Sequence, residues 1–235
     1  MKKKCFLLIA IVATLMSNAQ DVARYELDVN DFTELKVTEG INVDYKCNAD
    51  SVGKAVFYAT PEMASALMFT NKKGKLHIEL AQEAENAVGV PTVTVYSRFL
   101  TKAENSGDSL MRVLSVADCP EFKARIVGNG RLSVREINAT TVNASIDTGN
   151  GTIVINGRCD YAKLSYKGAG TIEADGLVAK DVKCTLVGTG SIGCNVSGQL
   201  TIVGASSGHL YYRGTPTGIK NNSIGVDIVP LDNEK

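Results

Sequence analysis

Apolar and polar residues alternate in short runs through the second half of the chain, and a pair of glycines separates one run from the next. Residues two apart on a strand point to the same side, so the apolar members of a run are predicted to share one face. The positions two and four residues after each glycine pair are apolar. The first position holds Leu132, Ile153, Ile172, Ile192 and Leu210, and the second holds Val134, Ile155, Ala174, Cys194 and Tyr212.

The run before each glycine pair alternates in the same way. The pattern therefore predicts coils made of two short strands that face one another across a thin apolar interior. One of these runs has an extra residue before its glycine, which a bulge or a longer corner would absorb. The inward pairs are predicted to be Ala124/Ile126, Ala144/Ile146, Leu164/Tyr166, Cys184/Leu186 and Leu200/Ile202.

The glycine pairs themselves recur at intervals of 21, 19 and 20 residues. A fixed period near 20 residues is typical of a solenoid. At each corner the chain must turn sharply and then lie flat on the next coil, which glycine does at little steric cost. Gly107 and Ser109 continue the period towards the N-terminus, whereas Gly204 and Gly208 form a stretched pair that leaves the register of the last coil open. The predicted structural turns are Gly128, Gly130, Gly149, Gly151, Gly168, Gly170, Gly188 and Gly190.

The sequence predicts no catalytic, cofactor-binding or metal-binding residue. A nucleotide-binding turn requires a long helix after the glycines, and the next turn signal comes too soon for one. The repeats also lack the aspartate that calcium-binding nonapeptide repeats place after their glycines. His77 and His209 are predicted to point outward, without a serine or cysteine nucleophile beside them. Four acidic residues fall at different phases of the repeat and are predicted not to line one face: Asp147, Asp160, Asp175 and Asp181.

The N-terminus carries the features of an export signal. Three lysines, Lys2 to Lys4, precede an apolar run from Cys5 to Met16, and small residues follow at Ser17 to Ala19. This pattern predicts a cleaved signal peptide over residues 1–19 and an exported protein that is periplasmic, displayed at the cell surface or secreted. Cleavage would remove three lysines and no acidic residue, which turns a net charge of zero into −3. That balance argues against nucleic acid as a partner.

Five cysteines follow the predicted signal: Cys47, Cys119, Cys159, Cys184 and Cys194. An odd number leaves at least one thiol unpaired, and spacing alone decides no pairing, a bridge from Cys47 to Cys119 included. Cys184 and Cys194 fall in the inward columns, so we expect them to act as small buried apolar residues.

The remaining chain, residues 20–235, is predicted to form one domain of an all-β class. Residues 20–97 read as an N-terminal β region and cap, 98–214 as the regular coils, and 215–235 as a C-terminal cap or tail. A stack of coils leaves an unpaired strand at each end, which must be capped or paired. Self-association into a homo-oligomer through these ends is a hypothesis that follows.

Three motifs together resemble a known family. Gly40-Ile41-Asn42 lies in an alternating strand, the serial glycine-pair coils follow, and Tyr211 to Pro216 closes the pattern. This combination is similar to the head GIN domain family of proposed autotransporter adhesins from Bacteroidetes, over roughly Phe32 to Gly225. The resemblance implies a right-handed, single-stranded parallel β-helix, similar to pectin lyases in fold, with a role in adhesion and no recognised catalytic set.

Two functional hypotheses remain. The first is a non-catalytic secreted or cell-surface protein that mediates cell adhesion or envelope contacts through its outer faces, with a host glycan, the matrix or an envelope component as ligand. The chain has no tryptophan for stacking on sugars, although tyrosines could serve instead. The alternative is a carbohydrate-active enzyme, lyase-like or hydrolase-like, on a degenerate β-helix. The candidate tyrosines are Tyr58, Tyr96, Tyr161 and Tyr211.

Overall fold

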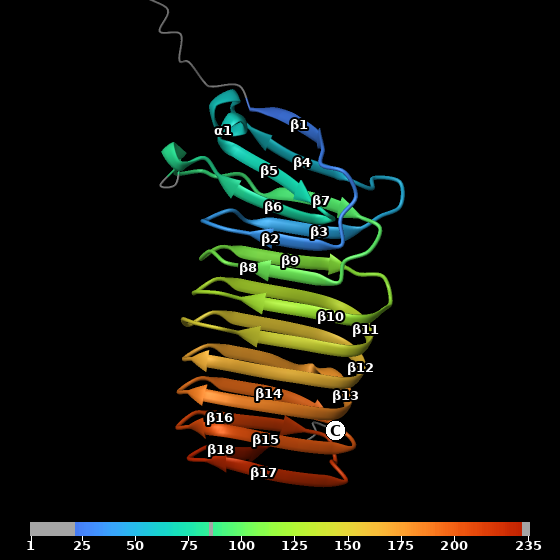
Figure 1. Cartoon of the computed structure of the whole chain (residues 1–235), viewed down its shortest axis with the longest axis vertical. Coiled ribbons are helices and arrows are strands. Elements are labelled where there is room, and N and C mark those ends of the chain that lie inside the picture. Colours follow the sequence, from blue (N-terminus) through green and yellow to red (C-terminus); the bar gives the residue numbers. More distant parts are fainter. Residues whose placement is uncertain (1–21, 85–86, 232–235) are drawn as a thin grey trace, which may run out of the picture.

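A computed structural model describes residues 22–84 and 87–231 of the chain. The protein is 66% strand and 4% helix and forms a β-solenoid of about six turns with coils of roughly 20 residues. Figure 1 shows the strands stacked along the long axis of the molecule. The fold class predicted from the glycine period is confirmed, whereas the predicted signal peptide lies outside the described residues. Within the described ranges, no helix is both long enough and apolar enough to cross a membrane.

The strands in the N-terminal part are short, and three in the C-terminal part are long. One α-helix, α1 (Pro61–Ala66), and one 3-10 turn, η1 (Gln82–Ala84), interrupt them. The strands are β1 (Ala23–Asp28), β2 (Glu34–Val37), β3 (Val43–Cys47), β4 (Lys54–Ala59), β5 (Leu67–Lys72), β6 (Lys75–Leu80), β7 (Val93–Ser97), β8 (Lys102–Asn105), β9 (Leu110–Ser115), β10 (Cys119–Ile126), β11 (Arg131–Ile146), β12 (Thr152–Gly168), β13 (Thr171–Gly188), β14 (Ser191–Val196), β15 (Gln199–Ser206), β16 (His209–Arg213), β17 (Gly218–Ile224) and β18 (Asp227–Pro230).

The coils build two parallel walls. The first wall runs through β6, β2, β8 and β10, the second halves of β11, β12 and β13, and then β15 and β17. The second wall runs through β7, β3 and β9, the first halves of the same three strands, and then β14, β16 and β18. The long strands belong to both walls because each bends once between them.

Aliphatic side chains from the two walls fill the interior, as the alternation predicted. Register pairs connect Leu132 to Ile153, Ile153 to Ile172, and so on to Leu210. The predicted inward cysteines, Cys184 and Cys194, are also buried. Each fully buried aliphatic side chain contributes roughly 1.5–3 kcal/mol. Repeated columns of this kind therefore hold the stack together. The first column contains Met111, Leu132, Ile153, Ile172, Ile192 and Leu210, all with 0% exposure.

The two glycines of a corner are required for different reasons. Gly188 has φ +121°, a conformation that side chains disfavour. Gly190 has an ordinary φ, but a Cβ there would overlap the carbonyl oxygen of Gly170 in the coil below. The first glycine thus makes the turn, and the second lets successive coils approach closely.

The last coil corrects one predicted alignment. Leu200 and Ile202 pair with Val182 and Cys184, not with Cys184 and Leu186 as predicted. The offset arises at the bend, because Ala174 pairs with Cys194 but Val182 pairs with Leu200, so the next coil is two residues shorter there. As a result Ser206, instead of Gly204, lies over the first corner glycine Gly188, and its Oγ lies 2.9 Å from the Tyr166 hydroxyl.

The N-terminal coils do not stack in sequence order. The β2–β3 coil lies between β6–β7 on one side and β8–β9 on the other. Beyond β6 and β7, the strands β5, β4 and β1 pair in antiparallel fashion and form that end of the rod, as Figure 1 shows. Coil-like strand pairs thus extend through Glu34 to Ser97, a region in which the sequence shows no regular repeat.

Candidate binding surfaces

A groove follows the edge at which the long strands bend from the second wall to the first. The bend falls at register shifts between Val134 and Ile137 in β11 and between Ala174 and Val178 in β13. Because successive bends stack, they leave a continuous furrow of about 610 Å³ across several coils. We call it the bend groove. Its lining residues are Asp118, Cys119, Pro120, Asn138, Ala139, Thr140, Arg158, Cys159, Asp160, Val178, Ala179, Lys180 and Ser197.

Small residues form the floor of the bend groove, and polar residues rise beside it. Cys119, Ala139, Cys159 and Ala179 are register partners in consecutive coils. Residues before and after this column point outward and alternate in chemistry along the rod. The amide of Asn138 donates to Asp118 Oδ2 at 2.7 Å, and acidic and basic groups follow at Arg158, Asp160 and Lys180. The groove therefore offers donors, acceptors and both signs of charge in a line.

The thiols of the groove are not activated for catalysis. Burial, assisted by the charge of Asp160, raises the pKa of Cys159 to about 11. Burial and the charge of Asp118 also raise the pKa of Cys119. A nucleophilic cysteine needs a lowered pKa, so both thiols stay protonated near neutral pH. The groove is suited to binding, and its cysteines are suited to packing.

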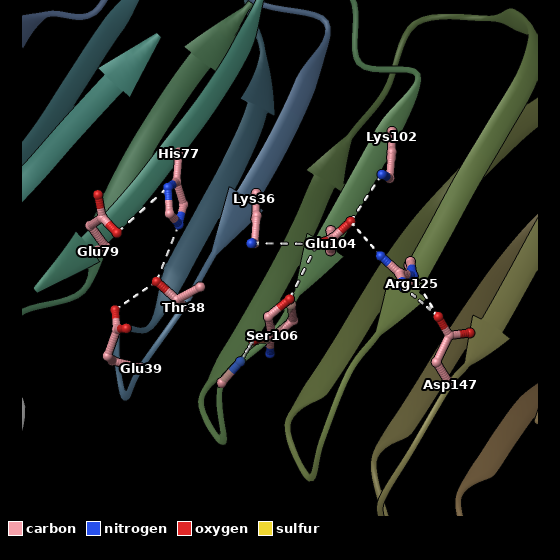
Figure 2. A network of polar contacts seen from close by, with 12 residues as sticks. Lys36, Thr38, Glu39, His77, Glu79, Lys102, Glu104, Ser106, Arg125 and Asp147 are labelled. Carbon is pink, nitrogen blue, oxygen red and sulfur yellow. Dashed lines mark hydrogen bonds and ion pairs between the residues drawn. The ribbon is translucent and has the colours of Figure 1, made fainter. Parts of the chain in front are cut away.

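A polar network on the first wall surrounds Glu104 (Figure 2). The side chain of Glu104 is only 6% exposed, and its carboxylate lies 2.9 Å from Lys102 Nζ and 3.1 Å from Arg125 Nη1. Arg125 in turn donates from Nε to Asp147 at 2.8 Å, and Lys36 Nζ lies 3.9 Å from Glu104. Burial alone raises the pKa of Glu104, but the hydrogen bonds and charges of Lys102 and Arg125 overcome it and bring the pKa to about 2.

This network binds coils together. Its members come from β2, β8 and β10, which are neighbours in the first wall. A carboxylic acid with a pKa near 2 is ionised at neutral pH and cannot donate a proton to a substrate. We therefore assign Glu104 a structural role.

The histidines lie on different walls. His77 on the first wall is 25% exposed, 3.2 Å from Thr38 Oγ1 and 3.6 Å from Glu79 (Figure 2). His209 on the second wall stacks on Tyr211 with ring centroids 5.9 Å apart, and lies 3.7 Å from Asp227. Within residues 22–84 and 87–231, no group of three or more His, Cys, Asp or Glu side chains could hold a metal ion.

The four phase-shifted acids have different surroundings. Asp147 pairs with Arg125, Asp175 lies 3.5 Å from Arg213, and Asp181 accepts the backbone N–H of Gln199 at 2.7 Å. Asp160 alone lies in the bend groove.

The four candidate tyrosines are likewise dispersed. Tyr58 lies in β4, and Tyr96 lies in the neighbouring strand β7, opposite Lys54. Tyr161 is on the first wall, and Tyr211 is on the second. They do not form one stacking platform.

Sequence reasoning did not predict the bend groove. A signal was present, because polar residues at Asp118, Asn138 and Arg158 recur with the period of the glycine pairs. The irregular bends between the two strands of each coil concealed it. Nothing in their composition distinguishes an outward furrow from an ordinary turn.

These features define a β-solenoid that has a packed interior and carries most of its polar side chains on the outer faces of the two walls and along the bend groove. The family model described as "putative auto-transporter adhesin, head GIN domain" matches residues 31–216, and the chain belongs to this family. The sequence-based assignment is confirmed. No curated protein matches the sequence.

Solved structures from Bacteroidetes share the fold. A protein described as a putative adhesin from Bacteroides fragilis aligns with TM-score 0.80 and 19% identity, over 90% of this chain and 97% of its own. A putative lipid binding protein from Parabacteroides distasonis aligns with TM-score 0.69 and 16% identity, over 91% and 98%. A putative adhesin from the same species aligns with TM-score 0.70 and 17% identity, over 91% and 98%. At such identities the likeness concerns the fold alone.

Proposed function

We propose that this protein is a non-catalytic adhesin-like binding protein, exported to the periplasm, the cell surface or the medium, and that the bend groove holds its ligand. The observation that carries the proposal is the groove itself, in which hydrogen-bonding side chains recur coil after coil along the rod. The family description as an adhesin supports this kind of role.

The chemistry of the groove favours an extended, polar ligand. Asn138 and Thr140 supply neutral hydrogen-bonding groups, Arg158 and Asp160 supply charge, and Val178 adds an apolar surface that is 54% exposed. A chain of sugars or an extended envelope polypeptide presents hydroxyls, amides and apolar edges at regular intervals. We propose a host glycan, matrix or envelope component of this type as the ligand.

Binding to a glycan array and to immobilised matrix proteins tests the proposal. A double variant, Thr140→Ala with Arg158→Ala, removes polar groups from the groove without touching the interior. The matched control is Thr148→Ala with Arg135→Ala, two exposed residues outside the groove. We expect the groove variant to weaken binding at least about tenfold, the effect of about 1.4 kcal/mol, while the control binds as the unmodified protein does. An equal loss of affinity in the groove variant and the control would contradict the proposal. So would the absence of any ligand on both the glycan array and the immobilised matrix proteins.

One observation favours the alternative of a carbohydrate-active enzyme. Asp118 and Asp160 both line the bend groove, and they lie two coils apart, which corresponds to about 10 Å. Inverting glycosidases separate their two carboxyl groups by roughly 6.5–9.5 Å. Release of reducing ends or unsaturated products from a polysaccharide panel, abolished by Asp160→Asn, would establish the enzyme and displace the binding protein.

A further inference from the structure

Lysines spaced along the sequence form one line on the outside of the first wall. Strand register places Lys102 beside Lys123, Lys163 beside Lys183, and Thr201 beside Lys220. The register continues through Asn143 between Lys123 and Lys163, and through Thr201 between Lys183 and Lys220. We call Lys102, Lys123, Lys163, Lys183 and Lys220 the lysine row.

The row is straight and runs parallel to the rod axis. Neighbouring strands lie about 4.8 Å apart, so adjacent lysines are separated by about 5 Å, and those with one coil between them by about 10 Å. From Lys102 to Lys220 the row spans on the order of 30 Å. Lys123, Lys163, Lys183 and Lys220 are exposed, whereas Lys102 is half-buried. Four ammonium groups therefore face the solvent along one wall.

Most of this charge is not neutralised within the protein. Lys102 forms an ion pair with Glu104, and Lys123 Nζ lies 3.0 Å from the carboxylate of the exposed residue Glu121. In the described part of the chain, no carboxylate lies within 4.0 Å of the ammonium groups of Lys163, Lys183 and Lys220. The pKa of Glu121 is lowered by its hydrogen bond with Lys123 and in part by the charge of Lys163. The Lys163 ammonium lies 5.6 Å from the ring centroid of Tyr161.

Three arginines of the second wall are paired, by contrast. Its arginines Arg112, Arg131 and Arg213 each lie within 4 Å of a carboxylate, those of Asp44, Glu173 and Asp175. Like charges directly opposite on neighbouring strands destabilise a sheet, so the adjacent pair Lys163 and Lys183 is unfavourable for the fold alone. A row of unpaired cations in this arrangement is complementary to a line of anionic groups outside the protein.

We propose that the lysine row binds a linear anionic polysaccharide, one whose sugars carry carboxylate or sulfate groups. The intervals of the row are comparable to one or two sugar units, so a single extended chain can place its charges opposite successive lysines. The single file favours a linear polymer over the planar surface of a membrane. The row lacks the arginines and interleaved aromatic residues that usually support nucleic-acid binding, apart from Tyr161. The site goes beyond the proposed groove function, because it lies on the outer face of a wall and uses different residues.

Affinity electrophoresis and calorimetry with polygalacturonate and chondroitin sulfate test this inference. Neutral dextran, duplex DNA and phosphatidylglycerol vesicles are the comparison probes. We expect both acidic glycans to bind the unmodified full chain, with an affinity that falls steeply between about 50 and 200 mM salt because counterions are released. Dextran should not bind.

The decisive variant is Lys163→Gln, Lys183→Gln and Lys220→Gln together. The matched control, Lys46→Gln, Arg98→Gln and Arg135→Gln, removes the same charge from exposed positions on or next to the second wall. The row variant should lose at least about tenfold in affinity and show a shallower salt dependence, while the control changes less than about twofold. Thermal unfolding verifies that both variants are folded, and the row variant should be no less stable.

Several results would overturn the inference. These are glycan binding that is equal in the row variant and the control, tighter binding to DNA or to vesicles than to the glycans, or no binding of either acidic glycan. The groove variant Thr140→Ala with Arg158→Ala should retain acidic-glycan binding, so a failure of the lysine row and a failure of the groove are separate outcomes.

Discussion

The hydroxyl of Tyr166 donates a hydrogen bond of 2.9 Å to the carbonyl oxygen of Gly190, a corner residue of the next coil. The same hydroxyl lies 2.9 Å from Ser206 Oγ and can accept the serine proton, and Ser206 Oγ also lies 2.6 Å from the Gly188 carbonyl oxygen. Tyr166 is 1% exposed, and burial raises the pKa of its phenol. One buried aromatic side chain thus connects three successive coils at their glycine corners.

Tyr166→Phe should lower the free energy of unfolding by about 1 kcal/mol, because it removes the hydrogen bonds of a buried hydroxyl, while the Gly190 carbonyl oxygen and Ser206 Oγ keep their other partners. Chemical denaturation monitored by circular dichroism measures the change. Tyr161→Phe is the control, since Tyr161 points outward from the same strand, and we expect a change within about 0.5 kcal/mol. An equal effect in the two variants would show that the corner bonds contribute nothing.

Gly190→Ala should destabilise the protein by at least about 2 kcal/mol, because the added methyl group would overlap the Gly170 carbonyl oxygen. Gly193→Ala in the same coil is the matched control. A Cβ at Gly193 meets its nearest neighbour, Asp175 Oδ1, at an ordinary 3.6 Å. Its unfolding midpoint should stay close to that of the unmodified protein. If the two alanine variants unfold alike, close stacking does not limit the corner.

Glu104→Gln should reduce the acid sensitivity of folding. The folded pKa of about 2 lies below the ordinary value of 4.5, so ionised Glu104 stabilises the fold above about pH 5, and this contribution is lost as the pH falls towards 2. The shift corresponds to roughly 3 kcal/mol at neutral pH. Unfolding curves between about pH 2 and 7 should converge for the two proteins at the acid end.

Glu121→Gln serves as the control for Glu104. Its carboxylate pairs with Lys123 at the surface, where water screens the interaction, so the pH dependence should change little. A gap between Glu104→Gln and the unmodified protein that persists at the acid end would contradict the assigned pKa.

The cysteines should differ sharply in reactivity. Cys184 and Cys194 are buried in the interior, and a hydrogen bond with Cys194 together with burial raises the pKa of Cys184. Cys159 is also nearly buried, with a pKa of about 11. Alkylation at neutral pH followed by mass spectrometry should modify Cys47 and Cys119 first. Prompt labelling of Cys184 in the folded protein would show that its column is open to solvent.

The alternating pattern predicted the interior because one physical rule governs it. Apolar and polar residues alternate along each strand, and this pattern recurs about every 20 residues. Leu132, Ile153 and Ile172 are therefore predicted to share one column, and the structure places them in register. Glycine pairs fixed the corners in the same way, since a side chain has no space there. The last coil, whose register the stretched glycine pair left open, is offset because its bend is two residues shorter, and no motif in the sequence marks that change.

The two proposed binding surfaces were not predicted, for a different reason. Net charge sums over all faces and conceals a row whose members, such as Lys163 and Lys183, meet only after folding. The insertion of β2 and β3 between later coils was also invisible, because Glu34 pairs with both Lys75 and Lys102 across long stretches of chain. Exact strand register, which sequence alone does not fix, determines both features.

That insertion has a mechanical consequence. Force applied at the C-terminal end meets β17 and β18, whose strands each have one neighbour, and can peel the coils away one by one. Force from the N-terminal side first meets β1, which pairs with β4 in the described part of the chain, and then β2 and β3, which are held by neighbours on both sides and must shear two interfaces at once. A rod pulled from its N-terminal end would therefore release β1 first and then resist at β2 and β3, while its C-terminal tip would extend gradually.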